Sequence, residues 1–129
     1  MSGDYILDSN IVINVFRGDA ETIKIVSQLN KVYVPVIVIG ELYYGANKSR
    51  QTNKKILEIE QLKQRVELLE VNELTSRYYG EIKDQLRQKG KPIPENDIWI
   101  AAIVKEKGLP LLTNDKHFQE VDGITISSV

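Results

Sequence analysis

The sequence predicts an α/β fold, a three-layer α/β/α sandwich with a central, mainly parallel sheet, and two observations carry this prediction. Short apolar runs typical of buried strands alternate with longer segments of helical periodicity, a pattern that gives parallel strands joined by right-handed crossovers. The 129 residues are 42% hydrophobic, which is enough for one core of ordinary domain size. Because no internal repeat or linker divides the chain, we expect a single domain over residues 1–129.

The first strand and the first helix are separated by small polar residues. Tyr5 to Leu7 predicts a buried strand, and residues 8–10 (Asp-Ser-Asn) can cap the helix indicated by Ile11 to Phe16. Residues 17–19, which include a glycine, end this helix. We expect a second helix from near Ala20 to Leu29.

The next strand leads into the most apolar part of the first half. Val32 to Val34 predicts the strand, Pro35 is suited to opening a helix, and Val36 to Gly45 continues as an almost wholly apolar helix. From Ile56 to Val66, apolar residues recur at intervals of three and four in a charged background, which predicts an amphipathic helix. A third strand is expected over Glu67 to Val71.

The second half repeats the alternation. Asn72 can cap a helix whose apolar stripe ends at Gly90, and a very apolar helix is expected from near Glu95 to Gly108. Leu109 to Thr113 and Ile124 to Ile126 predict the closing strands. Open α/β sheets hold their functional residues at the carboxyl ends of the strands, so the loops that leave these strands are the place to look for chemistry.

Composition excludes several classes of protein. The 17 Lys and Arg against 18 Asp and Glu give a net charge of −1, which argues against binding nucleic acid by bulk positive charge. With no Cys and one His, His117, the chain lacks disulfides, thiolate catalysis, cysteine-bound zinc and a poly-histidine site. The longest apolar stretch, Val32 to Tyr44, is interrupted and too short to span a bilayer, and no signal peptide precedes it, so a cytoplasmic protein is expected.

Four carboxylates stand apart from the acids of the solvent-facing segments: Asp8, Glu41, Asp97 and Asp115. Asp8 directly follows the first strand, Asp97 lies in the first turn of the most apolar helix, and Asp115 follows the strand that ends at Thr113. A structural role stays open for each of these three: helix capping for Asp8, interaction with the helix dipole for Asp97, and shaping of a turn for Asp115.

Glu41 differs because it interrupts an apolar helix. Burial of a lone carboxylate raises its pKa or requires a cation nearby, and none of the residues three or four positions away is basic. If all four carboxylates meet at the carboxyl edge of the sheet, they repel one another, and a hard cation such as Mg²⁺ or Mn²⁺ resolves the conflict. An acidic pocket of this kind favours phosphate chemistry.

Four motifs resemble those of the PIN domain family, and specifically of the VapC-type toxins of toxin–antitoxin pairs. They are residues 7–10 (LDSN), 38–45 (VIGELYYG), 92–102 (PIPENDIWIAA) and 112–118 (LTNDKHF), which stand in the order of the family and span almost the whole chain. Each motif alone is weak, and the four together are specific.

The resemblance implies a PIN-like fold and a metal-dependent endoribonuclease. In that family an acidic quartet binds Mg²⁺ or Mn²⁺ for RNA hydrolysis, and the matching positions here are Asp8, Glu41, Asp97 and Asp115. It also implies that Ser9 and Thr113 orient water or phosphate and that Asn96 supports Asp97, although a helix cap remains an equal alternative for Asn96. The expected partners are the RNA substrate, a VapB-type antitoxin and a second copy of the chain in a homodimer.

Other side chains receive weaker assignments. The basic residues after the Glu41 helix are candidates for contact with the RNA backbone, with a solvated helix face as the alternative for each: Lys48, Arg50, Lys54 and Lys55. Tyr43 and Tyr44 could stack on bases, although packing in the core or a dimer is the safer interpretation. Trp99 is expected in the core, and His117 is interpreted as a turn or surface residue.

A Mg²⁺-dependent phosphatase and a non-cleaving PIN module are the alternative interpretations. A phosphatase of the haloacid-dehalogenase type also places an Asp after its first strand, but it normally has a second Asp two residues later, where this chain has Asn10. A PIN fold that binds RNA or a protein without cutting is the other alternative, and the complete acidic quartet argues against it.

Overall fold

Five short strands form one parallel sheet in the computed structural model, which describes residues 1–129. The order across the sheet is β3-β2-β1-β4-β5, and every neighbouring pair is parallel. The strands are β1 (Asp4–Leu7), β2 (Lys31–Pro35), β3 (Glu67–Leu69), β4 (Leu111–Leu112) and β5 (Ile126–Ser127).

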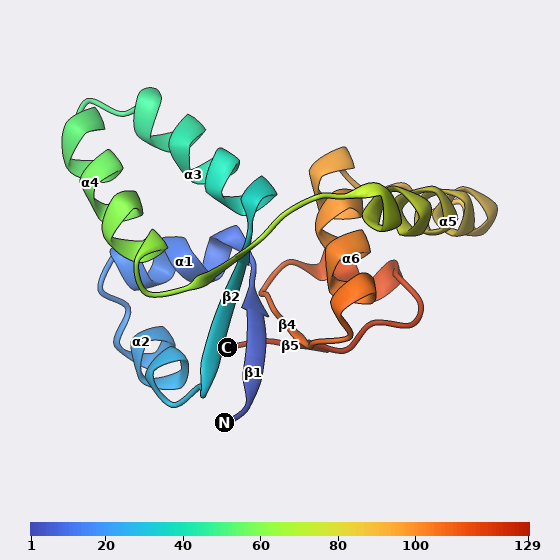
Figure 1. The fold of residues 1–129 in the computed structure, drawn as a ribbon, viewed down its shortest axis with the longest axis horizontal. Helices are drawn as coiled ribbons and strands as arrows, with labels where there is room; N and C mark the ends of the chain where they lie inside the picture. Colours follow the sequence, from blue (N-terminus) through green and yellow to red (C-terminus); the bar gives the residue numbers. More distant parts are fainter.

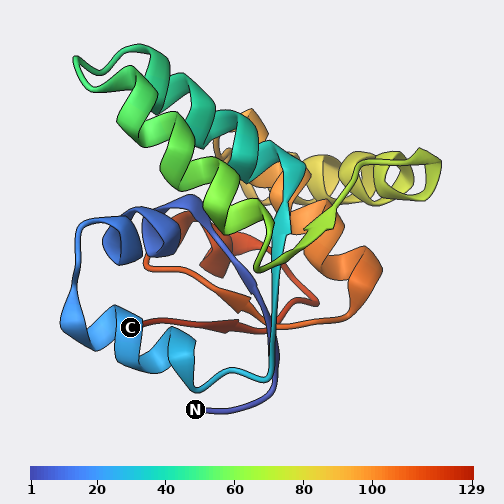
Figure 2. The same ribbon diagram turned by 60° about the vertical axis from the view of Figure 1, so that its left-hand side comes forward.

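Helices cover the sheet on both sides, as the sequence predicts. In Figure 1, α1 and α2 lie on one side of β1 and β2, and α5 and α6 lie on the other. The hairpin of α3 and α4 rises from the carboxyl end of β2 and projects away from the sheet (Figure 2). The helices are α1 (Ser9–Phe16), α2 (Ala20–Ser27), α3 (Val36–Asn47), α4 (Thr52–Lys63), α5 (Glu73–Lys89), α6 (Glu95–Lys107) and a 3-10 helix, η1 (Lys116–Glu120).

The topology fixes where a functional crevice can lie. The chain moves outward from β1 through β2 to β3, then crosses to β4 and β5 on the other side of β1. Connections therefore leave β1 and β4 in opposite directions, and such a switch point opens a crevice at the carboxyl ends of these two strands. Leu7 pairs with Leu112 in the register of β1 and β4, so the next residues, Asp8 and Thr113, emerge side by side.

Burial separates an apolar core from a polar edge. One cluster of 23 buried hydrophobic residues fills the space between the sheet and the helices. Only five polar or charged residues are buried, and three of them, Asp8, Asp97 and Thr113, lie at the carboxyl edge. The other two, Thr22 and Thr75, bond to the N-caps of α2 and α5. No helix is both long enough and apolar enough to cross a membrane.

The predicted strands and helices occur in the predicted order, but most of their bounds differ, and the sequence does not predict η1. The strands predicted over 67–71 and 109–113 shorten to β3 and β4, and the last strand is β5 (Ile126–Ser127) instead of 124–126. Gly123, with a φ of 82°, makes the preceding turn, and only Ile126 and Ser127 pair with β4. The helices α2 and α4 end at Ser27 and Lys63, earlier than their apolar patterns predict.

The prediction that Trp99 belongs to the core is wrong. The buried face of α6 carries the residues on either side of it, such as Ile98 and Ile100, whereas Trp99 is only partly buried. Its indole ring stacks on Tyr79 of α5, with ring centroids 4.1 Å apart and an angle of 16° between the planes. Trp99 therefore joins α5 to α6 at the surface.

Candidate active site

Asp8 is the fixed carboxylate of the crevice. It is the N-cap of α1 and is 2% exposed. Its Oδ1 accepts a hydrogen bond from the backbone N–H of Ser9 at 2.8 Å, and its Oδ2 accepts from the Thr113 hydroxyl at 2.7 Å and from Asn10 Nδ2 at 2.9 Å. These three donors hold the charged form in place, so the capping role and a position in the site belong to the same side chain.

Thr113 connects the loop after β4 to the start of α1. Besides donating to Asp8, its Oγ1 accepts hydrogen bonds from the backbone N–H of Asp115 at 3.0 Å and from Asn10 Nδ2 at 3.3 Å. Asn10 Oδ1 in turn accepts from the backbone N–H of Asn114 at 3.0 Å. The loop that carries Asp115 is therefore fixed relative to Asp8 by a small polar network.

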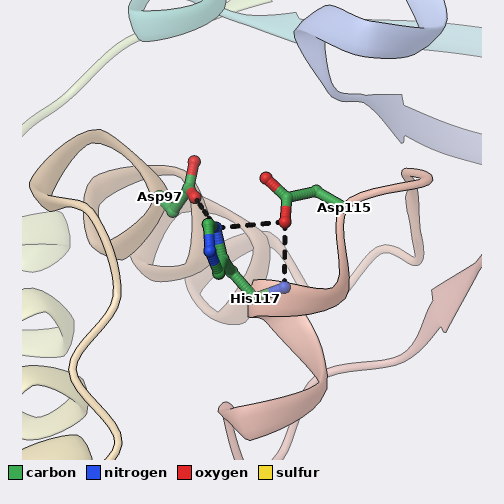
Figure 3. A group of neighbouring side chains, drawn as sticks. All are labelled: Asp97, Asp115 and His117. Carbon is green, nitrogen blue, oxygen red and sulfur yellow. Dashed lines mark hydrogen bonds and ion pairs between the residues drawn. The ribbon is translucent and has the colours of Figure 1, made fainter.

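Asp97 and Asp115 face each other across a histidine (Figure 3). Asp97 is in the first turn of α6 and Asp115 is the N-cap of η1, where its Oδ1 accepts from the backbone N–H of His117 at 2.9 Å. His117 Nδ1 is hydrogen-bonded to Asp97 Oδ2 at 3.0 Å and lies 3.0 Å from Asp115 Oδ1. One oxygen of each aspartate and a nitrogen of His117 lie within 4.8 Å of one another.

Glu41 approaches the same region from α3. Its Oε1 is buried and has no hydrogen-bond partner. Burial raises the pKa of Glu41, the negative charges of Asp8 and Asp97 raise it further, and the side chains of Asn96 and Ser9 oppose the rise. The prediction that Glu41 is partly buried beside the other carboxylates is confirmed.

Burial also raises the pKa of two other carboxylates, Asp8 and Asp97. Burial raises the pKa of Asp8, and the negative charge of Asp115 adds to the rise. Burial likewise raises the pKa of Asp97, with further contributions from Asp115 and Asp8, although the hydrogen bond with His117 opposes it. No Lys or Arg forms an ion pair with any member of the quartet.

This arrangement fits a divalent cation. Four carboxylates converge without a Lys or Arg to neutralise them, and one buried oxygen lacks any donor. A hard cation that prefers oxygen ligands supplies both the missing charge and the missing partner. Asp97, Asp115 and His117 have ligand atoms within 4.8 Å of one another. Asp8 and Glu41 lie outside this group of three, but the charge of Asp8 raises the pKa of both Glu41 and Asp97.

Comparison with known proteins identifies the family. A model of the PIN domain family matches residues 5–124. The chain belongs to the PIN domain family. It is 38% identical over 122 residues to ribonuclease VapC2 of Haemophilus influenzae, with 91% of each chain covered. It is 28% identical over 123 residues to the tRNA(fMet)-specific endonuclease VapC of Shigella flexneri, with 93% of each chain covered.

Solved structures agree with this assignment. The VapBC-1 structure from nontypeable Haemophilus influenzae matches with a TM-score of 0.87 at 33% identity, covering 97% of each chain. The VapBC2 structure from Rickettsia felis, bound to a fragment of promoter DNA, has a TM-score of 0.90 at 24% identity over 98% of each chain and supports the fold. The PIN-like fold and the VapC group expected from the four motifs are therefore confirmed, and the phosphatase alternative is removed.

The PIN fold brings most of the predicted site residues to one edge. The quartet of acids gathers there with Ser9, Asn96 and Thr113. The predicted basic residues lie elsewhere: they are exposed around the turn between α3 and α4, at the tip of the projecting hairpin (Figure 2). We call these residues the tip cations: Lys48, Arg50, Lys54 and Lys55.

The sequence does not predict the contacts of two residues at the carboxyl edge of the sheet. His117 was interpreted as a turn or surface residue, yet it contacts both Asp97 and Asp115. The sequence places Asn10 in the capping run and in the first motif but assigns it no role in the site, yet it bonds to both Asp8 and Thr113. Position was the available signal, because each residue lies two places after a quartet acid, within the first turn of the helix that the acid caps.

Proposed function

We propose that this PIN protein is a divalent-metal-dependent endoribonuclease that hydrolyses phosphodiester bonds of RNA, and that it is the toxin of a VapBC-type pair. The observation that carries the proposal is the convergence of four carboxylates at the switch point of the sheet, with one buried oxygen unpaired. The ribonuclease and tRNA-endonuclease names of its relatives indicate RNA as the substrate class.

We assign the binding of Mg²⁺ or Mn²⁺ to the four carboxylates. When bound, such a cation supplies Lewis-acid stabilisation of the charge that develops on the phosphate. Ser9, Asn10 and Thr113 donate hydrogen bonds to Asp8, so its carboxylate keeps one position in the site. The proton of the attacking water goes to Asp97 or Asp115, the two carboxylates that His117 bridges.

Ser9, Thr113 and Asn96 act as positioning residues in this proposal. The Thr113 hydroxyl donates to Asp8 and accepts from the Asp115 backbone, so it sets the separation of two quartet members. Ser9 and Asn96 lie beside Glu41, where their side chains oppose the rise of its pKa and so favour its charged form.

RNA contact outside the acidic edge is assigned to the tip cations. Lys48, the C-cap residue of α3, is seven residues beyond Glu41, which is about 10 Å along the helix axis and nearly the same face. A strand whose phosphate reaches Glu41 can therefore continue along α3 toward the tip. These side chains supply the positive charge that the near-neutral chain lacks as a whole.

The proposed protein partners are a VapB-type antitoxin and a second copy of the chain. Solved relatives are VapBC complexes, and the α3–α4 hairpin leaves apolar surface uncovered in the isolated chain. Tyr44 of α3 is 68% exposed and Leu57 of α4 is 58% exposed. Large exposed apolar side chains on a projecting hairpin are typical of contact surfaces.

The test is RNA cleavage by the purified chain with Mg²⁺ or Mn²⁺. We expect EDTA, Asp8→Asn and Asp97→Asn to abolish cleavage while circular dichroism shows a folded protein. Asp4→Asn is the matched control, because Asp4 is exposed at the opposite end of the strand that Asp8 follows. Cleavage by both site variants would contradict the site, and metal-independent RNA binding without products would indicate a non-cleaving module.

A further inference from the structure

His117 is the one basic group inside the acidic edge, and it is the only histidine of the chain. Figure 3 shows its imidazole between the carboxylates of Asp97 and Asp115. The ring is well placed because the next residue, Phe118, is fully buried and anchors η1 to the core. The backbone N–H of His117 also donates to Asp115 Oδ1 at 2.9 Å, which fixes the start of η1.

The spacing of the three polar atoms suits a shared cation. Nδ1 lies 3.0 Å from Asp97 Oδ2 and 3.0 Å from Asp115 Oδ1. Adjacent ligands of an octahedral ion with bonds of about 2.1 Å are separated by about 3.0 Å. The other ring nitrogen, Nε2, has no hydrogen-bond partner in the protein, and the side chain is 49% exposed. In the tautomer that carries its proton on Nε2, Nδ1 no longer donates to Asp97 and offers its lone pair to a cation.

We propose that His117 is a nitrogen ligand of the divalent-cation site, and that it biases this site toward first-row transition cations such as Mn²⁺ over Mg²⁺. The inference rests on the proposed function, because it takes the carboxylate quartet as the metal site. Mg²⁺ selects oxygen ligands, whereas an imidazole nitrogen adds affinity for transition cations. Carboxylate oxygens accept both ions, so His117 adds the one nitrogen donor in the site that favours Mn²⁺.

The competing role for His117 is a hydrogen bond alone. A protonated Nδ1 that only donates to Asp97 would orient the carboxylate without touching the ion. The two roles differ in a direct way: only a ligand puts a nitrogen nucleus next to the cation. Replacement by Asn separates them further, because the Asn amide lies where Nδ1 was and offers a hydrogen bond or an oxygen ligand, but no coordinating nitrogen.

The experiment is pulsed electron paramagnetic resonance of the full chain with Mn²⁺ alone. Because the chain has one histidine, ¹⁵N-histidine labelling identifies its nitrogen without ambiguity. We expect nitrogen modulation in the unlabelled protein, its replacement by the ¹⁵N pattern on labelling, and its loss in His117→Asn. We also expect the ratio of Mn²⁺ to Mg²⁺ affinity, measured by calorimetry, to fall at least about tenfold in this variant.

Gln119→Ala is the matched control, since Gln119 is an exposed residue of the same 3-10 helix and should change neither result. Bound Mn²⁺ without histidine modulation in the wild-type protein would overturn the role of His117 and leave the proposed function standing. An unchanged affinity ratio in His117→Asn would overturn the selectivity. Absence of any Mn²⁺ binding by the wild-type protein would overturn both proposals.

Discussion

Replacing Thr113 by Val removes the hydroxyl at the centre of the site and keeps the volume of a buried side chain. This hydroxyl donates to Asp8 at 2.7 Å and accepts from the backbone N–H of Asp115 at 3.0 Å and from Asn10 at 3.3 Å. Thr113 is 3% exposed, so water does not readily replace these bonds. The variant therefore tests whether the polar network holds the crevice together.

The expected loss of stability follows from the bonds removed. The hydrogen bond to ionised Asp8 contributes about 1.5–3 kcal/mol, and the Asp115 N–H left without a partner adds about 1 kcal/mol. The total is about 2.5–4 kcal/mol. The unfolding entropy of a 129-residue domain is about 0.27 kcal/mol/K, so the melting temperature should fall by about 9–15 °C.

The assay is urea and thermal unfolding at pH 7 in EDTA, with Thr113→Ser as the matched control. Serine keeps the hydroxyl and loses one buried methyl group, so it should cost only about 1 kcal/mol. The reasoning is wrong if Thr113→Val unfolds with the same free energy as Thr113→Ser, or lies within about 0.5 kcal/mol of the wild type.

Three further predictions concern other parts of the molecule. Because burial and the neighbouring acids raise the pKa of Glu41 in the fold, the folded protein holds that proton to a higher pH than the unfolded chain. In EDTA, Glu41→Gln should therefore have the same free energy of unfolding as the wild type near pH 4 and a higher one as the pH rises. The difference at pH 8 should be only about 0.5–1 kcal/mol, because water screens a half-buried charge. Urea titrations at both pH values check this, and a difference independent of pH would contradict it. Thr75→Val removes the hydroxyl that bonds to Glu106 and to the backbone of Asn72, so it should lower the free energy of unfolding by about 1–2 kcal/mol while RNA cleavage is unchanged. Changing all four tip cations to Gln should weaken RNA binding and flatten its salt dependence, with the cleavage rate at saturating RNA preserved; an unchanged salt slope would place the RNA elsewhere.

The fold and the acids could be predicted because their signals are local. Apolar periodicity and caps such as Asn72 give the order of the elements, and Asp8 and Asp115 stand directly after apolar runs that end as strands. Parallel strands bring such positions to one edge whatever the details of packing. Glu41 could be predicted as the fourth acid of the site because no basic residue lies three or four positions from it on its own helix.

The remaining features depend on contacts between distant elements. His117 and Asp97 are twenty residues apart, and only the packing of η1 against α6 brings the imidazole to the carboxylate. Trp99 lies on an apolar helix, but whether it enters the core depends on which face meets α5, and Tyr79 holds it at the surface. Strand β5 has two residues, so its position is set by its partner β4 and not by its own sequence.

The four acids are not equivalent in the hydrogen bonds that they receive, and this difference has a measurable consequence. Asp8 accepts from three donors, whereas Glu41 Oε1 accepts from none. Burial raises the pKa of both acids, but an amide at position 8 faces donors that it cannot satisfy, so the change from acid to amide should have opposite signs at the two positions without metal. At Glu41 it removes repulsion and stabilises the fold at high pH.

In Asp8→Asn, the Nδ2 group of the new side chain takes the place of Oδ2, which in the wild type accepts from the Thr113 hydroxyl and from Asn10 Nδ2. A donor then faces two donors. The Thr113 hydroxyl can turn to accept, but the Asn10 amide cannot, because its Oδ1 already accepts from Asn114. In EDTA, Asp8→Asn should lower the free energy of unfolding by about 1–2 kcal/mol, and the variant should still be folded at 25 °C. Equal stabilisation by Asp8→Asn and Glu41→Gln in unfolding experiments would mean that repulsion alone governs the edge and that the Asn10 and Thr113 network contributes nothing.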